Sequence, residues 1–173
     1  DGERVALVLG ATEAEDRPYL VAFDRAMRAS ALPLRDGVVA ELGALSRGED
    51  AFCGTLLDAE RVPGGALVVF DALAVCGFDV RRRSFLARLE AARPIVEALG
   101  DGVSLKRWRP LARLAEAYAE PGPPRDGVIL MPRGAVGAAP IYKWKEPLGH
   151  TLDFEWRGGE WWMGATATAA AVG

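Results

Sequence analysis

The chain has 173 residues, of which 50% are hydrophobic and 26% are charged, so it is long enough to form one globular domain with a substantial core. Its 21 basic and 24 acidic residues give a net charge of −3, which excludes a protein coated with positive charge but allows a local cationic cleft. One histidine, His150, and two cysteines, Cys53 and Cys76, provide no zinc-ligand constellation.

We expect both cysteines to be reduced residues of the core, which fits a cytosol-like compartment. No apolar run approaches the ~20 residues that a membrane span needs, and no signal peptide is recognisable, so we expect no membrane partner and an intracellular location. The residue bias of GC-rich coding sequence and the compact loops would suit a large DNA virus. The protein would then act in the cytoplasm, the nucleus, or the virion or viral factory.

The first half of the chain predicts two pairs of strands. Val5 to Leu9 and Tyr19 to Phe23 form the first pair, joined by a polar loop. Ala51 to Glu60 and Gly65 to Val75 form the second, around a turn that contains Pro-Gly-Gly. Residues 24–34 could be helical or irregular, and both alternatives stay open.

Two helices are predicted in the middle of the chain. The first covers Ser84 to Leu99, with Ser84 as N-cap and Gly100 just beyond its end. Pro94 should kink this helix or divide it, because proline removes a backbone donor and collides with the preceding turn. The second helix begins near Pro110 and carries a short apolar stripe: Leu111, Leu114 and Tyr118.

Residues 125–147 predict two further strands. Asp126 to Met131 is a continuous apolar run behind an acid, as in a buried strand with a polar mouth, whereas Ile141 to Lys145 alternates. The period of two places Lys143 and Lys145 on one face, near the carboxylate of Asp126. Like charges so close favour an anion between them, and phosphate is the obvious candidate. The alternative is that both lysines are solvated residues of an edge strand.

The C-terminal segment predicts one more hairpin, from the alternation of His150 to Trp156, the turn at Gly158-Gly159, and Trp161 to Met163. We expect the tail, residues 164–173, to be disordered. A lone hairpin with an apolar face is only marginally stable in water, so we expect the chain to self-associate through this hairpin or to fold it back onto its own body. Its apolar residues are Leu152, Phe154, Trp156, Trp161 and Trp162.

Five motifs follow one another along the chain: DGER at Asp1 to Arg4, LLDAE at Leu56 to Glu60, VVFDAL at Val68 to Leu73, DGVILMP at Asp126 to Pro132 and YKWK at Tyr142 to Lys145. This succession resembles the covalent nucleotidyltransferases, namely mRNA capping guanylyltransferases and their relatives, the ATP-dependent DNA and RNA ligases. The motifs differ in specificity: DGVI or YKWK alone would be common, but all five in order are hard to reach by chance. DGVILMP with its aspartate, and KWKEP followed by HTLDFEW, favour the capping branch.

The resemblance implies an α+β fold of mostly antiparallel sheets around a nucleotide cleft, over residues 1–147. Residues 148–163 would begin a truncated oligonucleotide-binding (OB) fold, ahead of the tail. The resemblance also implies a chain truncated at both ends, because the nucleophilic lysine of the family's KxDG motif would lie two places before Asp1. Ala59 stands where the family usually has glycine, which would constrain the backbone if that position needed positive φ.

The nucleoside end of the implied site would be formed by the earlier motifs. Asp1 and Gly2 match the end of KxDG, and Arg4 matches its arginine, which is expected to contact the ribose. Glu60 resembles the acid that binds the ribose or orients the lysine, and Phe70 the aromatic residue that stacks on the purine. Taken singly, Phe70 would be a core residue, Glu60 a turn acid and Arg4 a solvated charge.

The phosphate end would be formed by the later motifs. Asp126 resembles the carboxylate that holds a divalent metal, Mg²⁺ or Mn²⁺, and Glu60 is a second candidate ligand. Lys143 and Lys145 match the pair that stabilises charge on the α-phosphate, with Lys143 also near the base. Taken singly, Asp126 could simply cap the break after the preceding prolines. Lys106 lies outside all five motifs.

The implied activity is transfer of GMP from GTP, through a lysyl-GMP intermediate, to the 5′-diphosphate end of RNA. Two alternatives stay open: the adenylation domain of an ATP-dependent polynucleotide ligase, and a non-catalytic module that binds nucleotide or RNA. We expect Asp58, Asp71 and His150 to have structural roles only.

Overall fold

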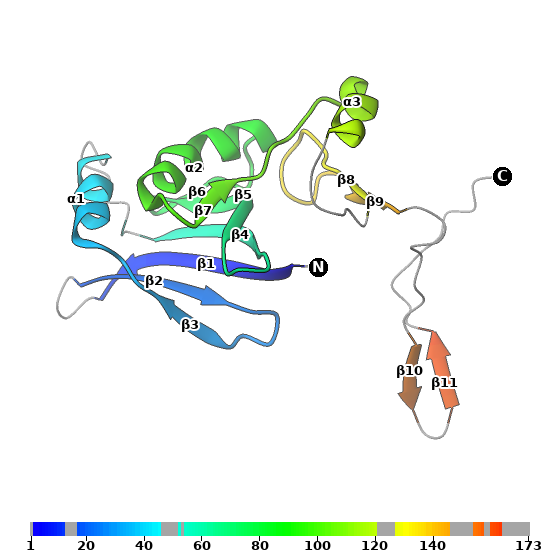
Figure 1. Ribbon diagram of the computed structural model, residues 1–173, viewed down its shortest axis with the longest axis horizontal. Coiled ribbons are helices and arrows are strands. Elements are labelled where there is room, and N and C mark those ends of the chain that lie inside the picture. Colours follow the sequence, from blue (N-terminus) through cyan, green and yellow to red (C-terminus); the bar gives the residue numbers. More distant parts are fainter. Residues whose placement is uncertain are drawn as a thin grey trace.

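A computed structural model of the chain (Figure 1) describes residues 2–12, 17–45, 52, 54–120, 127–145, 154–157 and 160–163. Several features that the sequence singles out lie outside these ranges: Asp1, Asp126, Cys53, His150, Leu152 and the tail. Within the described residues the chain has a mixed α+β fold with a mostly antiparallel sheet and three α-helices. No helix in these ranges is long and apolar enough to cross a membrane.

The described elements follow one another in a simple order. They are β1 (Glu3–Ala11), β2 (Pro18–Phe23), β3 (Ala29–Leu32), α1 (Asp36–Leu45), β4 (Thr55–Arg61), β5 (Leu67–Val75), β6 (Phe78–Asp79), α2 (Phe85–Leu99), β7 (Val103–Leu105), a 3₁₀ turn (Leu111–Arg113), α3 (Leu114–Ala119), β8 (Val128–Leu130), β9 (Tyr142–Trp144), β10 (Phe154–Arg157) and β11 (Glu160–Met163).

A seven-stranded sheet organises the first part of the chain, in the order β3-β2-β1-β4-β5-β6, with β7 paired to β5. All neighbours are antiparallel except β5 and β7. Alternate residues of the central strands are buried, and α1 and α2 cover this face (Figure 1). The core between them includes Val5, Leu7, Leu9, Leu57 and Val69 from the sheet and Ala92, Ile95, Val96 and Leu99 from α2. The two predicted strand pairs are therefore confirmed.

Residues 24–45 differ most from the sequence prediction. Where helix and irregular structure were both open, the chain makes a turn and then β3, which pairs with β2. Helix α1 follows in a segment where no element was predicted. Its two glycines, Gly37 and Gly43, weaken intrinsic helix formation. Val38 and Leu42, one turn apart, are buried against the core, so tertiary packing holds this helix.

Helix α2 runs without interruption through Pro94, so of the two predicted effects, a kink or a division, the division does not occur. Pro94 lies on the exposed side of the helix, where water can reach the carbonyl group that loses its backbone donor. The predicted ends are confirmed. The Ser84 hydroxyl accepts a hydrogen bond from the Ala87 amide at 3.4 Å, and Gly100 ends the helix with φ +66°.

The predicted second helix is confirmed but short, and its apolar stripe stays at the surface. Leu111 is 68% exposed and Tyr118 is 41% exposed. The Tyr118 ring meets the Trp144 ring edge-on, with 6.0 Å between centroids. The stripe therefore joins α3 to β9 and does not enter the core.

The two strands predicted in residues 125–147 are present as β8 and β9, which pair antiparallel with Ile129 opposite Lys143. They form a two-stranded sheet separate from the large one. The prediction that the first of these strands is buried is wrong, since Ile129 is 38% exposed. A two-stranded ribbon outside the large sheet cannot enclose its own side chains. The C-terminal hairpin is confirmed as β10 and β11, paired from Phe154 opposite Met163.

A buried ion pair joins three parts of this fold. The Arg88 side chain of α2 is 2% exposed and donates two hydrogen bonds to the Asp71 carboxylate of β5, at 2.7 and 2.8 Å. Its remaining Nη1 donates to the carbonyl oxygens of Arg83 and Gly134, at 2.9 and 3.0 Å. Arg88 therefore connects helix, sheet and the loop between β8 and β9.

We predict that Arg88→Met destabilises the protein by about 3–5 kcal/mol, because it leaves the Asp71 carboxylate buried without its partner. Urea unfolding measures the change. Arg93→Met is the matched control, since Arg93 lies on the same helix but pairs with Glu90 at the exposed surface, and its effect should be much smaller. A variant that also changes Asp71 to Leu should recover part of the loss. Equal losses of stability from Arg88→Met and Arg93→Met would contradict the role of Arg88 as the buried partner of Asp71.

We predict that Gly127→Ala disrupts the pairing of β8 and β9. Gly127 has φ +140°, and a Cβ there would overlap the carbonyl group of Trp144, with 3.0 Å to its carbon. Amide hydrogen exchange of residues 128–130 and 142–144 should accelerate. Gly43→Ala, in α1, is the control. A Cβ there meets open space, so the helix should gain about 0.5–1 kcal/mol. Unchanged protection in the Gly127 variant would be evidence against the close approach.

Candidate nucleotide-binding site

The predicted residues of the nucleoside end gather on the sheet face opposite α2. On β1 and β4 the core residues alternate with residues that point to the other side, and the latter include Arg4, Asp58 and Glu60. The antiparallel register places Arg4 opposite Glu60, and Ala6 opposite Asp58. Strand order thus brings together two motifs that lie more than 50 residues apart in the chain.

Arg4 is held in a defined orientation on this face. Its Nε donates to Asp58 Oδ1 at 2.8 Å and its Nη2 donates to the other carboxylate oxygen, which makes a two-point contact. Its guanidinium carbon lies 5.8 Å from the centre of the Phe70 ring. The hydrogen bonds that the Arg4 guanidinium donates to the Asp58 carboxylate raise the pKa of Arg4. The side chain remains 59% exposed, so a ligand can still reach it.

Phe70 is half-buried and belongs to this face, so it is not a core residue. In the pairing of β5 with β4, Val69 lies opposite Ala59 and Asp71 opposite Asp58, and Phe70 is skipped. Such an irregularity re-aims side chains. The alternation of buried Leu67, Val69 and Asp71 along β5 directs Asp71 inward to Arg88 and leaves Phe70 outside beside Arg4, and the irregularity brings this inward Asp71 opposite the outward Asp58.

Glu60 contacts both the start of the chain and a residue that the motifs did not include. A Cβ on Gly2 would collide with its side chain, at 2.8 Å from Cδ, so glycine at this position lets Glu60 lie against β1. Lys106 Nζ lies 3.6 Å from a Glu60 carboxylate oxygen. The Lys106 amide also donates to the Val69 carbonyl at 2.7 Å, which fixes this residue beside β5. Lys106 therefore belongs to the site although no motif contains it.

The parallel pairing of β7 with β5 is what brings Lys106 to this place. The two strands are separated in the sequence by the whole of α2. A lysine that follows a three-residue strand gives no local sign of this distant pairing. Ala59 needs no glycine-like backbone, because Met27 and Cys76 are the non-glycine residues with positive φ in the part of the chain that the structure describes. The departure from the family pattern at Ala59 thus brings no strain.

The predicted phosphate end lies on the second small sheet. Lys143 is on β9 and Lys145 directly follows it. Because Gly127 approaches the backbone of Trp144 and Lys145, the beginning of the DGVILMP motif and the end of YKWK lie together. Asp126 is outside the described residues. In Figure 1 this hairpin lies toward the end of the molecule where β1 begins. Gly2 directly precedes that strand and Arg4 is its second residue.

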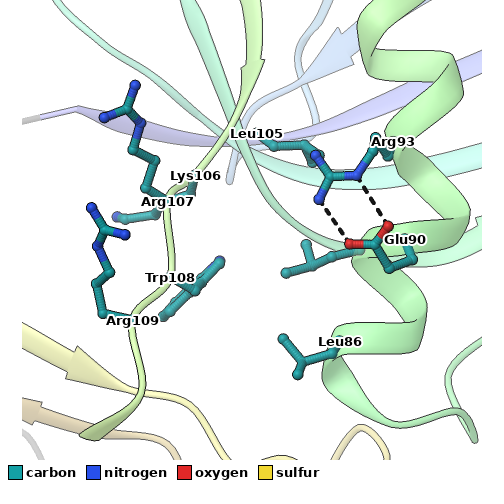
Figure 2. Close-up of a pocket in the computed structure, with 9 residues that line it drawn as sticks. Leu86, Glu90, Arg93, Leu105, Lys106, Arg107, Trp108 and Arg109 are labelled. Atoms are coloured by element: carbon teal, nitrogen blue, oxygen red, sulfur yellow. Dashed lines mark hydrogen bonds and ion pairs between the residues drawn. The ribbon is translucent and has the colours of Figure 1, made fainter. Parts of the chain in front are cut away.

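A cavity of about 410 Å³ lies between α2 and residues 105–109, and it shares only Lys106 with the site described above (Figure 2). Figure 2 shows Arg93 hydrogen-bonded to Glu90 at its edge, and Arg109 pairs with Glu120 at 3.0 Å. Three of its four cations are thus paired with carboxylates. It is lined by Leu86, Leu89, Glu90, Arg93, Leu105, Lys106, Arg107, Trp108 and Arg109. None of the described residues that were predicted to bind the nucleotide lines it.

Among the described residues, no three acids, histidines or cysteines gather closely enough to hold a metal ion. No protein-family model matches the chain, and no curated protein matches it significantly.

Proposed function

We propose that the chain is the nucleotidyltransferase domain of an mRNA guanylyltransferase. One observation carries the proposal: Gly2, Arg4, Glu60 and Phe70, from three separate motifs, lie together on one face of the sheet. An aromatic ring, an oriented guanidinium and a carboxylate are the groups that would hold a purine nucleoside. The hairpin with Lys143 and Lys145 would hold the phosphates.

In the proposed reaction a lysine two places before Asp1 attacks the α-phosphorus of GTP. A P–N bond forms, the bond to the β-phosphate oxygen breaks, and pyrophosphate leaves. A terminal phosphate oxygen of the RNA 5′-diphosphate then attacks the same phosphorus, and the P–N bond breaks. Lys143 and Lys145 stabilise the charge on the phosphate oxygens in both steps, while Arg4 and Phe70 hold the nucleoside.

The divalent ion would be held by Asp126 together with the phosphates of the nucleotide, since Mg²⁺ commonly binds through one or two carboxylates and phosphate oxygens. Glu60 fits this role poorly, because the Lys106 ammonium group is 3.6 Å from its carboxylate and would compete with a cation. The contact with Lys106 favours a role for Glu60 at the ribose. We further propose that β10 and β11 begin an OB-fold domain.

Covalent labelling tests this function directly. Lysine and one small residue would be placed before Asp1, an OB-fold domain would be restored after the hairpin, and the protein incubated with α-labelled GTP or ATP and Mg²⁺ or Mn²⁺. We expect an acid-labile, alkali-stable label from GTP that requires the added lysine and Lys145. Labelling by ATP alone would instead indicate a ligase. A folded protein labelled by neither would indicate a non-catalytic binding module.

We also predict that the chain itself binds GTP weakly, because stacking and anion attraction do not need the nucleophile. Lys145→Ala should weaken this binding, measured by calorimetry, by about tenfold, as the loss of one charge-assisted contact would. Arg25→Ala is the control, since Arg25 is an exposed cation at the β2–β3 turn, whereas Lys106 touches Glu60 and cannot serve as one. Equal effects of Lys145→Ala and Arg25→Ala on GTP affinity would mean that the lysines of YKWK are only solvated residues of an edge strand.

A further inference from the structure

Four exposed arginines lie together outside the candidate nucleotide site. Arg81, Arg82 and Arg83 form the turn before α2, and Arg133 lies in the loop between β8 and β9. We call this group the arginine patch. Its two segments are far apart in the sequence, so the patch exists only in the folded protein.

Backbone hydrogen bonds hold the two segments together. The Phe85 amide donates to the Arg133 carbonyl and the Val136 amide to the Arg81 carbonyl, both at 2.9 Å. The buried Arg88 side chain binds the carbonyls of Arg83 and Gly134, one from each segment. The backbone under the patch is therefore fixed before any ligand binds. Binding then does not have to order this part of the chain, which lowers its entropic cost.

The two segments that carry the patch have an excess of positive charge. Residues 78–86 and 131–140 contain one acid, Asp79, which binds Arg81 at 2.7 and 2.9 Å. Four arginines and one acid leave a local charge of +3 on a chain whose net charge is −3. Like charges crowded in this way repel one another unless an anion neutralises them.

We propose that the arginine patch binds the phosphodiester backbone of single-stranded RNA. Guanidinium groups match phosphate geometry through paired N–H donors. Phe78, 50% exposed and next to Asp79, offers a ring on which a base can stack. The proposal rests on the proposed function: Arg133 lies in the loop between the strands of the phosphate-binding hairpin, so the patch would hold the RNA behind its reacting 5′ end.

The test is the binding of a 5′-hydroxyl, single-stranded RNA to the chain, followed by fluorescence anisotropy between 50 and 200 mM salt. The triple variant Arg82→Ala, Arg83→Ala, Arg133→Ala should bind at least about tenfold more weakly at low salt. The slope of log K against log salt should fall by about 2, since each lost phosphate contact contributes about 0.7. Arg81 is kept because it pairs with Asp79.

The matched control removes three exposed arginines elsewhere: Arg25→Ala, Arg35→Ala, Arg107→Ala. It changes the net charge equally, so an equal loss of RNA binding would overturn the proposal. Competition by poly-L-glutamate as strong as that by RNA of equal charge would also overturn it, in favour of an acidic protein partner.

A 5′-hydroxyl RNA cannot accept GMP and no GTP is present, so this result does not depend on the transfer reaction. Absence of GTP labelling would refute the guanylyltransferase and leave the RNA measurement valid. The affinity of the triple variant for GTP should stay within about twofold of that of the unchanged chain. If GTP binding were lost together with RNA binding, the proposal that the RNA surface is separate from the nucleotide site would be overturned.

Discussion

The buried contact between Asp71 and Arg88 is the constraint on which the arrangement of this protein depends. Two charges taken out of water are stable only if their hydrogen-bonding groups are satisfied. Asp71 accepts two bonds from Arg88, and Arg88 uses a further nitrogen for two carbonyl groups, one beside its own helix and one in the β8–β9 loop. The electrostatic requirement of a single side chain thus fixes the sheet, the helix and the hairpin loop relative to one another.

The same pair explains how one strand serves two faces. Asp71 must point into the protein to reach Arg88, and the preceding residue must then point out. The skipped pairing at Phe70 accommodates this arrangement without disturbing the buried run of Leu67 and Val69. β5 therefore contributes a charge to the interior and an aromatic ring to the candidate site from adjacent positions.

The sequence predicts the features that depend on local patterns. Apolar runs joined by a polar loop or turn identify β1, β2, β4 and β5, and the cap residues identify both ends of α2. Features that depend on distant contacts are not predicted: α1 has weak helix propensity and is held by packing, and Lys106 reaches Glu60 through a parallel strand pair. Arg88 and Asp71 are 17 residues apart on different elements, a spacing that carries no signal. The site residues on the large sheet are predicted from the motifs of the family resemblance, whereas the place of the hairpin relative to them depends on how its loop is anchored, which no local pattern encodes.

The β8–β9 hairpin depends on this anchoring for its stability. A two-stranded ribbon is marginally stable alone, and Ile129, Tyr142 and Trp144 are substantially exposed. The contacts that restrain it come from the Gly127 approach within the ribbon, the Tyr118 ring, and the loop tied to the beginning of α2. These contacts use backbone groups and an aromatic ring, and the buried Arg88 adds its bond to the Gly134 carbonyl, so none of them uses the guanidinium groups of the exposed arginines in the patch. The loop that positions the proposed phosphate site therefore also presents positive charge to the solvent, which is the arrangement an extended polyanion would need.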